Sequence, residues 1–244
     1  MITRAYKIAD KVIEVNSLYD KVHKYCTDYI TNEKTDFSVV IQQTDINAEK
    51  QKSDSEYLCE GKIIPSFSDE ELEVTAVYRK IAEIMPNFDT FVFHGSVIAV
   101  DGQAFLFTAK SGTGKSTHTR LWREMLGDKA IMVNDDKPML KITNTGVIAY
   151  GTPYNGKHRL DTNISVPLKT LCILERAEKN QIQRITKKDI YSMLIQQVYR
   201  PQDPVQMAKT LKLIDQLAEK VELYRLGCNM DPSAAEVAYN VMKG

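Results

Sequence analysis

Residues 109–122, AKSGTGKSTHTRLW, combine glycines, a lysine and hydroxyl groups at a spacing that suits phosphate binding. Gly112 and Gly114 let the backbone curl, so that successive N–H groups face inward as an anion nest. Lys115 supplies a mobile cation for the β and γ phosphates of a nucleotide, and Ser116 supplies a hydroxyl for Mg²⁺. The segment therefore predicts a nucleotide-binding loop.

The pattern departs from the strict G-x-x-x-x-G-K-[ST] motif because Ala109 stands at the first glycine position. The alternative interpretation is a glycine-rich helix start that binds no ligand. The residues expected to bind the nucleotide are Lys110, Ser111, Gly112, Thr113, Gly114, Lys115, Ser116 and Thr117.

Two adjacent acids, Asp135 and Asp136, end the next apolar run, AIMVNDD. Taken alone, such a pair often only begins a turn. Beside a phosphate loop, the two acids become candidates for a metal ligand and a general base. Neighbours on a strand point to opposite faces, so we expect the two carboxylates to have different roles.

The elements around the loop have the order that such a site requires. Two strand-like runs, FVFHGSVIAV and QAFLFTAK, are joined by Asp101-Gly102, which is a strong hairpin signal. The second run leads into the loop, and residues 115–126 then read as a helix that Gly127 stops. Because a hairpin precedes the loop, we expect an α/β fold with a mixed sheet rather than a purely parallel one.

The remaining chain is expected to form a small β-rich N-terminal region, residues 1–65, and a nucleotide-binding domain, residues 66–244. Within the first region, residues 8–15 and 37–43 have strand character, residues 17–30 have helical spacing, and Asp45 to Glu56 read as an exposed loop or hairpin. Ser68 and Glu71 are spaced as a capping box for a helix that Pro86 ends.

Composition narrows the function classes. Lys plus Arg equals Asp plus Glu, at 32 each, so no basic excess points to nucleic acid. No apolar run is long enough for a membrane span, and the N-terminus does not read as a signal peptide. The four cysteines are scattered, which favours separate reduced thiols in a cytoplasmic protein.

The stretch from His94 to Asp136 resembles the catalytic domain of HPr kinase/phosphorylase, a bacterial serine kinase family related to ATP-dependent phosphoenolpyruvate carboxykinase. The matching motifs are FHGSVIAVDG, AKSGTGKST and IMVNDDKP, in that order, and Ser111 is a mark of the family. The resemblance extends from about residue 90 to residue 200. It implies a carboxykinase-like fold, ATP and Mg²⁺ as cofactors, and a dimer or hexamer as permitted oligomers.

The resemblance also implies catalytic roles. Asp135 would be the base that accepts the proton of the substrate hydroxyl, while Asp136 would assist the metal together with Ser116. His94 would lie near the phosphates, and Arg200 would help to bind the transferred phosphoryl group. On the residues alone, His94 reads as a packed core histidine and Arg200 as a surface charge.

A loop, GTPYNGKHRLDTN, stands where the resembled family has its signature stretch. Lys157, His158 and Arg159 in this loop are candidates for contacts to phosphate or to an acidic substrate. The alternative is that the loop is merely solvated.

Three functions remain open from the sequence. The first, which we favour, is a kinase that transfers the γ-phosphoryl group of ATP to a hydroxyl of a protein, a peptide or a small molecule. The second is a nucleotide-dependent regulatory or partner-binding module without efficient transfer. The third is a decarboxylating carboxykinase, for which the chain is short and which rests on analogy of fold alone.

Overall fold

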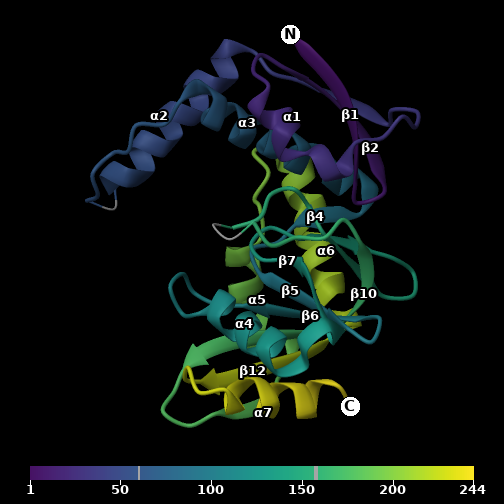
Figure 1. Ribbon diagram of the computed structural model, residues 1–244, viewed down its shortest axis with the longest axis vertical. Helices are drawn as coiled ribbons and strands as arrows, with labels where there is room; N and C mark the ends of the chain where they lie inside the picture. The colour runs from purple at the N-terminus through teal and green to yellow at the C-terminus, as the bar shows by residue number, and fades with distance from the viewer. Residues whose placement is uncertain (60, 157–158) are drawn as a thin grey trace. The chain divides into compact units, whose positions relative to one another are not determined.

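The computed structural model describes residues 1–59, 61–156 and 159–244. The chain divides into two compact units, Met1–Ile84 and Met85–Gly244 (Figure 1). The boundary expected from the sequence, after residue 65, differs from this division because the helix that follows it belongs to the first unit. In the described part of the chain, no helix combines the length and apolar character that a membrane crossing requires.

The first unit contains a three-stranded sheet in the order β1-β2-β3 and several helices. Their bounds are β1 (Ile2–Ile8), β2 (Lys11–Ser17), α1 (Lys21–Tyr25), η1 (Thr27–Tyr29), β3 (Phe37–Val40), α2 (Gln43–Cys59) and α3 (Asp69–Ile84). Strand β1 pairs antiparallel with β2, and β2 pairs parallel with β3. The single strand expected at residues 8–15 is wrong, because Ala9 and Asp10 adopt positive φ angles and form the turn between β1 and β2.

Helix α2 corrects the expectation of an exposed loop or hairpin at Asp45 to Glu56. This helix has no apolar stripe, and Ile46 is its only buried residue among those described. Ion pairs to α3 hold it instead, with Glu49 at 2.7 Å from Arg79 and Asp45 at 2.7 Å from Lys80. A pattern search for apolar periodicity misses such a helix because it has no apolar stripe, and charged side chains supply much of its contact with α3.

The start of α3 confirms the expected capping box. The backbone N–H of Ser68 donates to the Glu71 carboxylate at 3.1 Å, and the N–H of Glu71 donates to Ser68 Oγ at 3.4 Å. Helix α3 then ends at Ile84, before Pro86. The two reciprocal bonds satisfy backbone donors that the first turn of a helix leaves free.

The second unit is built on a nine-stranded mixed sheet, which confirms the expected fold class. Its strands are β4 (Thr90–Val92), β5 (Ser96–Val100), β6 (Gln103–Thr108), β7 (Ala130–Asn134), β8 (Met139–Ile142), β9 (Val147–Tyr150), β10 (Ser165–Arg176), β11 (Gln181–Arg184) and β12 (Glu222–Cys228). The central order is β7-β5-β6-β10-β12-β11. Strands β6, β10 and β12 run parallel, while β5 runs antiparallel to both β6 and β7. The first residues of β10 also pair with β9, which continues the sheet to β8 and β4.

Helices cover both faces of this sheet (Figure 1). They are α4 (Lys115–Leu126), α5 (Lys187–Gln197), α6 (Pro204–Lys220) and α7 (Ser233–Met242), with short turns η2 (Met85–Phe88) and η3 (Gly127–Lys129). On one face, Leu121 and Trp122 of α4 and Ala238 of α7 pack on Phe105 and Phe107 of β6. On the other face, the apolar residues of α5 and α6 pack against alternate residues of the same strands.

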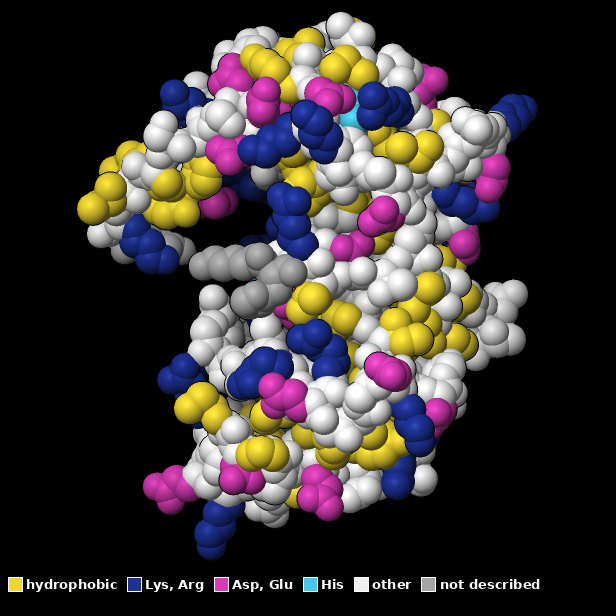
Figure 2. Space-filling view, in the orientation of Figure 1, with side chains coloured by type: hydrophobic (Ala, Val, Ile, Leu, Met, Phe, Trp, Pro, Cys, Tyr) yellow, Lys and Arg dark blue, Asp and Glu magenta, His cyan; other side chains and the backbone are white. Residues whose placement is uncertain are grey.

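Charges of both signs are interspersed over the face shown in Figure 2. The dark blue Lys and Arg side chains lie beside magenta Asp and Glu side chains rather than in one continuous field. The mixed distribution agrees with the composition of the chain, which has equal numbers of acidic and basic residues. That the protein binds no nucleic acid stays a prediction.

Candidate functional site

Strand direction brings the chemical groups of the sequence to one edge of the sheet. Strands β6 and β7 run in the same direction with β5 between them, because β5 pairs antiparallel with each. The loop after β6 and the acids after β7 therefore emerge at the same edge. His94 lies two residues before the start of β5, which begins at that edge. The ends of β10 and β12 lie there too, since both run parallel to β6.

The loop has the backbone shape expected of an anion-binding turn. Gly112 and Gly114 have φ angles of 75° and 119°, which residues that carry a Cβ rarely adopt. The N–H of Thr113 donates to the carbonyl of Lys110 at 3.2 Å, and the N–H of His118 donates to that of Gly114 at 2.9 Å. Helix α4 begins at Lys115, so its free N–H groups and positive dipole end face the loop.

A cavity of about 470 Å³ joins the loop to the two acids. It is lined by Ser111, Gly112, Gly114, Lys115, Ser116, Thr117, Asp135, Asp136 and Gly156. Burial lowers the pKa of Lys115, although the charges of Asp136 and Asp135 oppose that effect. An ammonium partly withdrawn from water and facing a cavity is suited to an anionic ligand.

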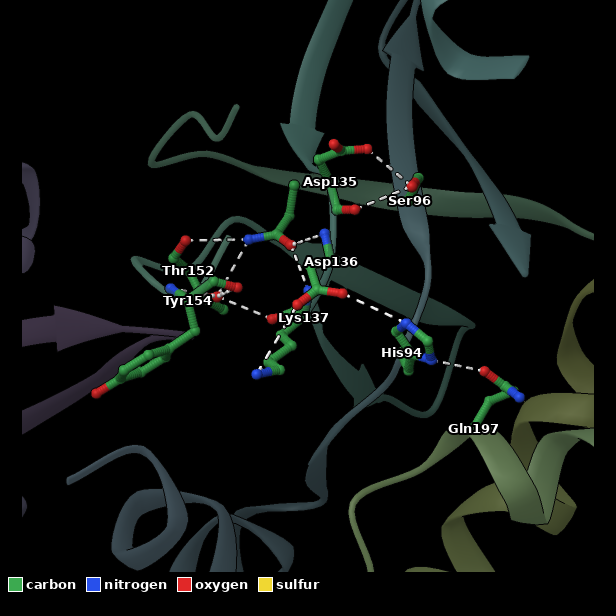
Figure 3. A network of polar contacts seen from close by, with 9 residues as sticks. His94, Ser96, Asp135, Asp136, Lys137, Thr152, Tyr154 and Gln197 are labelled. Carbon is green, nitrogen blue, oxygen red and sulfur yellow. Dashed lines mark hydrogen bonds and ion pairs between the residues drawn. The ribbon is translucent and has the colours of Figure 1, made fainter. Parts of the chain in front are cut away.

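Asp135 is nearly buried, with 4% of its surface exposed. Ser96 Oγ lies 2.9 Å from Asp135 Oδ1 and 3.0 Å from the Asp135 carbonyl oxygen, so that one serine fixes the residue (Figure 3). The other carboxylate oxygen, Oδ2, lies on the side of Gly156, which lines the cavity. Asp135 thus has one oxygen held and one oxygen toward the cavity.

Asp136 is held by a different set of partners. His94 Nε2 lies 3.3 Å from Asp136 Oδ1, and His94 Nδ1 lies 2.8 Å from Oε1 of Gln197 (Figure 3). Burial raises the pKa of Asp136, but the hydrogen bond from His94 and the charges of Lys137 and Lys115 outweigh it. The net pKa lies below its ordinary value, which keeps this carboxyl anionic.

Asn134 shapes the turn that carries both acids. Its Oδ1 accepts hydrogen bonds from the backbone N–H groups of Asp136, at 2.9 Å, and Lys137, at 2.7 Å. Its Nδ2 donates to the carbonyl and hydroxyl oxygens of Thr152. This Asx-type turn sends the chain sharply away after β7 and leaves the two carboxylates at the cavity.

The oxygen atoms at the cavity suit a hard divalent cation. Ser116 and Asp136 line the cavity on which Lys115 also opens, and hydroxyl and carboxylate oxygens are ligands that Mg²⁺ accepts alongside phosphate. Within the described residues, no cluster of three or more His, Cys, Asp or Glu side chains could hold a metal by itself. The donor set therefore fits a metal that arrives with a phosphate ligand.

The structure gathers most of the residues selected from the sequence. Six of the eight expected loop residues line this cavity, as do Asp135 and Asp136. Thr113 lines a second, adjacent cavity of about 540 Å³, and Lys110 is exposed. His94 reaches the site through Asp136. Arg200 is exposed and does not line either cavity, although Val198, two residues earlier, bridges to Phe93.

Gly156, which belongs to the segment of residues 151–163, lines the same cavity. Lys157 and His158, the candidates for phosphate or substrate contacts, lie outside the described residues. Arg159 is described and is exposed, with a positive φ angle of 48°. Its expected contact to phosphate stays a prediction.

Sequence reasoning missed the residues that orient the site. Ser96 stands two positions after His94, so its place in the sequence could have put it near the site as well. Asn134 could have been found from the N-D-D run, because asparagine commonly caps turns through its side chain. Gln197 and Arg176 have no such local signal. Arg176 Nη2 donates to the carbonyl of Gly112 at 2.6 Å across a large sequence separation.

The fold and the site together define an α/β protein with a glycine-rich loop and an acidic pair at one edge of its sheet. Residues 58–232 match the family model described as SynChlorMet cassette protein ScmC, and the chain belongs to that family. A search of curated proteins finds no match.

Among solved structures, the HPr(Ser) kinase/phosphatase from Coxiella burnetii is similar at 11% sequence identity and a TM-score of 0.34. The match covers 63% of this chain and 99% of that one. A likeness at this level is a distant relationship of fold at most, and we transfer no residue role from it.

Proposed function

We propose that this protein is an ATP-dependent kinase that transfers the γ-phosphoryl group to a hydroxyl. One observation carries the proposal: the nearly buried carboxylate of Asp135 opens on the same cavity as Lys115 and Ser116 of the loop. Binding a nucleotide requires the loop alone. A second, separately held acid beside it is what phosphoryl transfer to a hydroxyl needs in addition.

Each side chain of the site has a distinct task in this proposal. The backbone N–H groups of residues 110–117 and the ammonium of Lys115 bind the phosphates of ATP. Ser116 and Asp136 hold Mg²⁺, which when bound neutralises charge on the phosphate oxygens. His94 positions Asp136, since its Nε2 lies 3.3 Å from that carboxylate. Arg200 is the residue that would reach the transferred group from the segment after α5.

The chemical step uses Asp135 as the general base. Its carboxylate takes the proton of the acceptor hydroxyl while that oxygen forms a bond to the γ-phosphorus. The bond between the γ-phosphorus and the bridging oxygen breaks, and ADP leaves with the electron pair. The products are a phosphorylated acceptor, ADP and a proton, which Asp135 releases to water.

The acceptor is a serine of a protein or peptide, or a hydroxyl of a small molecule. All four cysteines are free, which supports a reducing compartment such as the cytoplasm. We place the reaction there. A homo-oligomer is compatible with this proposal but is not required by it.

The test incubates the purified protein with γ-labelled ATP and Mg²⁺, with and without extract of its own cells. Wild-type protein should move label to an acceptor. Asp135→Asn should lower the transfer rate by about a hundredfold or more, while nucleotide binding persists. Lys115→Ala should lower both. The exposed Asp128, on η3 outside the cavity, gives a matched control, Asp128→Asn, which should behave as wild type.

If the Asp135→Asn variant transferred label at the wild-type rate, Asp135 would not be the general base. Bound nucleotide or slow phosphate release, with no labelled acceptor and no effect of Asp135→Asn, would instead support the regulatory or partner-binding module.

A further inference from the structure

A second cavity lies on the other side of the phosphate loop. Its volume is about 540 Å³, and it shares Gly112, Gly114 and Thr117 with the cavity that contains the acids. Its remaining walls come from the segment after β10 and the end of β12, including Ala177 and Met230. The volume falls within the range of small-molecule sites, which span about 300–1,000 Å³.

His118 lines this second cavity and carries a hydrogen-bond donor that nothing in the described chain uses. The ring is 2% exposed, and its Nε2 accepts a hydrogen bond from Trp122 Nε1 at 3.1 Å. Because Nε2 accepts this hydrogen bond it carries no proton, so the ring proton is on Nδ1. Nδ1 is buried and has no partner among the described residues. A buried donor left without an acceptor is costly, which points to an acceptor on a ligand.

Arg176 lines the second cavity and contacts the phosphate loop. Its guanidinium is anchored by the 2.6 Å hydrogen bond to the carbonyl of Gly112, in the loop itself. A guanidinium fixed in this way offers a flat cationic surface that stacks on aromatic rings. Ala177 and Met230 add apolar surface, and the Met thioether makes favourable contacts with aromatic rings.

We propose that the second cavity binds the purine nucleoside of the nucleotide whose phosphates occupy the loop. His118 Nδ1–H donates to a ring nitrogen of the base, and the base lies against Arg176, Ala177 and Met230. This inference rests on the proposed binding of nucleotide phosphates by the loop. It adds the nucleoside subsite, which the acids and the loop do not specify.

The test compares a ligand that carries the nucleoside with a triphosphate chain that lacks it. Calorimetric titration measures the binding of Mg-ATP and of Mg-tripolyphosphate to the full-length protein. Wild-type protein should bind ATP at least about tenfold more tightly, which corresponds to about 1.4 kcal/mol. Ala177→Trp, at an exposed position that lines the cavity, should fill the subsite. It should reduce ATP affinity to that of tripolyphosphate and leave tripolyphosphate binding within about twofold of wild type.

Lys179→Trp provides the matched control, because Lys179 is exposed nearby and does not line the cavity. It should leave both affinities unchanged. His118→Phe keeps a ring beside Phe107 and Trp122 but removes the donor, so it should weaken ATP binding severalfold without weakening tripolyphosphate binding. Thermal unfolding checks that this variant is folded; if it is not, Ala177→Trp decides.

Equal binding of the two ligands by wild-type protein, or equal weakening of both by Ala177→Trp, would overturn the nucleoside subsite and leave the phosphate loop standing. Failure of both ligands to bind would overturn the subsite and the proposed function together. Tight ATP binding that Ala177→Trp removes, with no labelled acceptor in the kinase assay, would support the subsite and refute phosphoryl transfer.

Discussion

At the scale of single residues, the two adjacent acids differ in what surrounds them. Asp135 is tied by Ser96 and nearly buried, whereas Asp136 is paired with His94 and remains partly open to solvent. The pKa of Asp136 is held below its ordinary value by the hydrogen bond from His94 and the charges of Lys137 and Lys115, which keeps this carboxyl anionic at neutral pH. The structure thus supports separate duties for neighbouring side chains of the same chemical type.

Ser96 should act as a positioning residue for Asp135. Ser96→Ala removes the bond at 2.9 Å and leaves a nearly buried carboxylate oxygen without that donor. A hydrogen bond to a charged group contributes about 1.5–3 kcal/mol, so the transfer rate at saturating ATP should fall by about tenfold or more. Tripolyphosphate affinity should stay within about twofold.

Ser165→Ala, at an exposed position on β10, serves as the control for the Ser96 variant. An unchanged rate, or an equal loss of tripolyphosphate affinity, would show that Ser96 does not act through Asp135.

Lys115 should make phosphate binding depend on pH. Burial lowers its pKa below the ordinary 10.5, and bound phosphates favour the protonated amine. Affinity for tripolyphosphate should therefore be present at pH values below the Lys115 pKa and fall as the pH rises through it. Calorimetry from about pH 7 to pH 10 measures this loss. Lys115→Arg keeps its charge across that range and should show a flat profile; the same fall in both proteins would contradict the assignment.

At the scale of elements, the antiparallel strand β5 connects the two halves of the site. Because β5 lies between β6 and β7, its first residues sit between the loop and the acids. The N–H of Gly95 donates to the carbonyl of Asp136 at 3.0 Å. The packing at Gly95 is therefore part of what sets the position of the acidic pair.

Gly95→Ala should destabilise the second unit. A Cβ at this position would lie 2.7 Å from Leu106 Cδ1 and 2.9 Å from the carbonyl oxygen of Phe107, and the latter is backbone that cannot rotate away. Overpacking of this kind costs about 1–3 kcal/mol, which denaturant unfolding resolves. Gly146→Ala is the matched control, since nothing lies within 4 Å of a Cβ there. Equal stability of the two variants would contradict the packing argument.

Local signals explain which elements could be predicted. The Asp101-Gly102 hairpin, the helix after the loop and the Ser68 capping box each depend on residues close in sequence, and the structure confirms all three. Helix α2 was not predicted because it has no apolar stripe and its ion pairs join it to residues of α3, which are distant in the sequence. The hydrogen bonds between Gln197 and His94 and from Arg176 to the loop could not be predicted either, because they too join residues far apart in the sequence.

At the scale of the whole molecule, the second unit carries its own core. Both apolar clusters that cover its sheet consist of residues from Phe91 to Met242. A chain of residues 85–244 should therefore unfold cooperatively and bind tripolyphosphate within about threefold of the full-length protein. Circular dichroism and calorimetry check these two properties. Absence of a cooperative transition would show that the second unit depends on residues 1–84.

The turn of the hairpin that leads into the loop is a suitable place to attach a probe. This turn, Asp101-Gly102, is exposed, lies at the opposite end of β5 and β6 from His94 and the loop, and leaves open space around Gly102. Exposed turns of this kind tolerate added residues well. A short peptide tag or a fluorophore attached there would report on binding and folding while the chemical groups at the other end of the strands stay untouched.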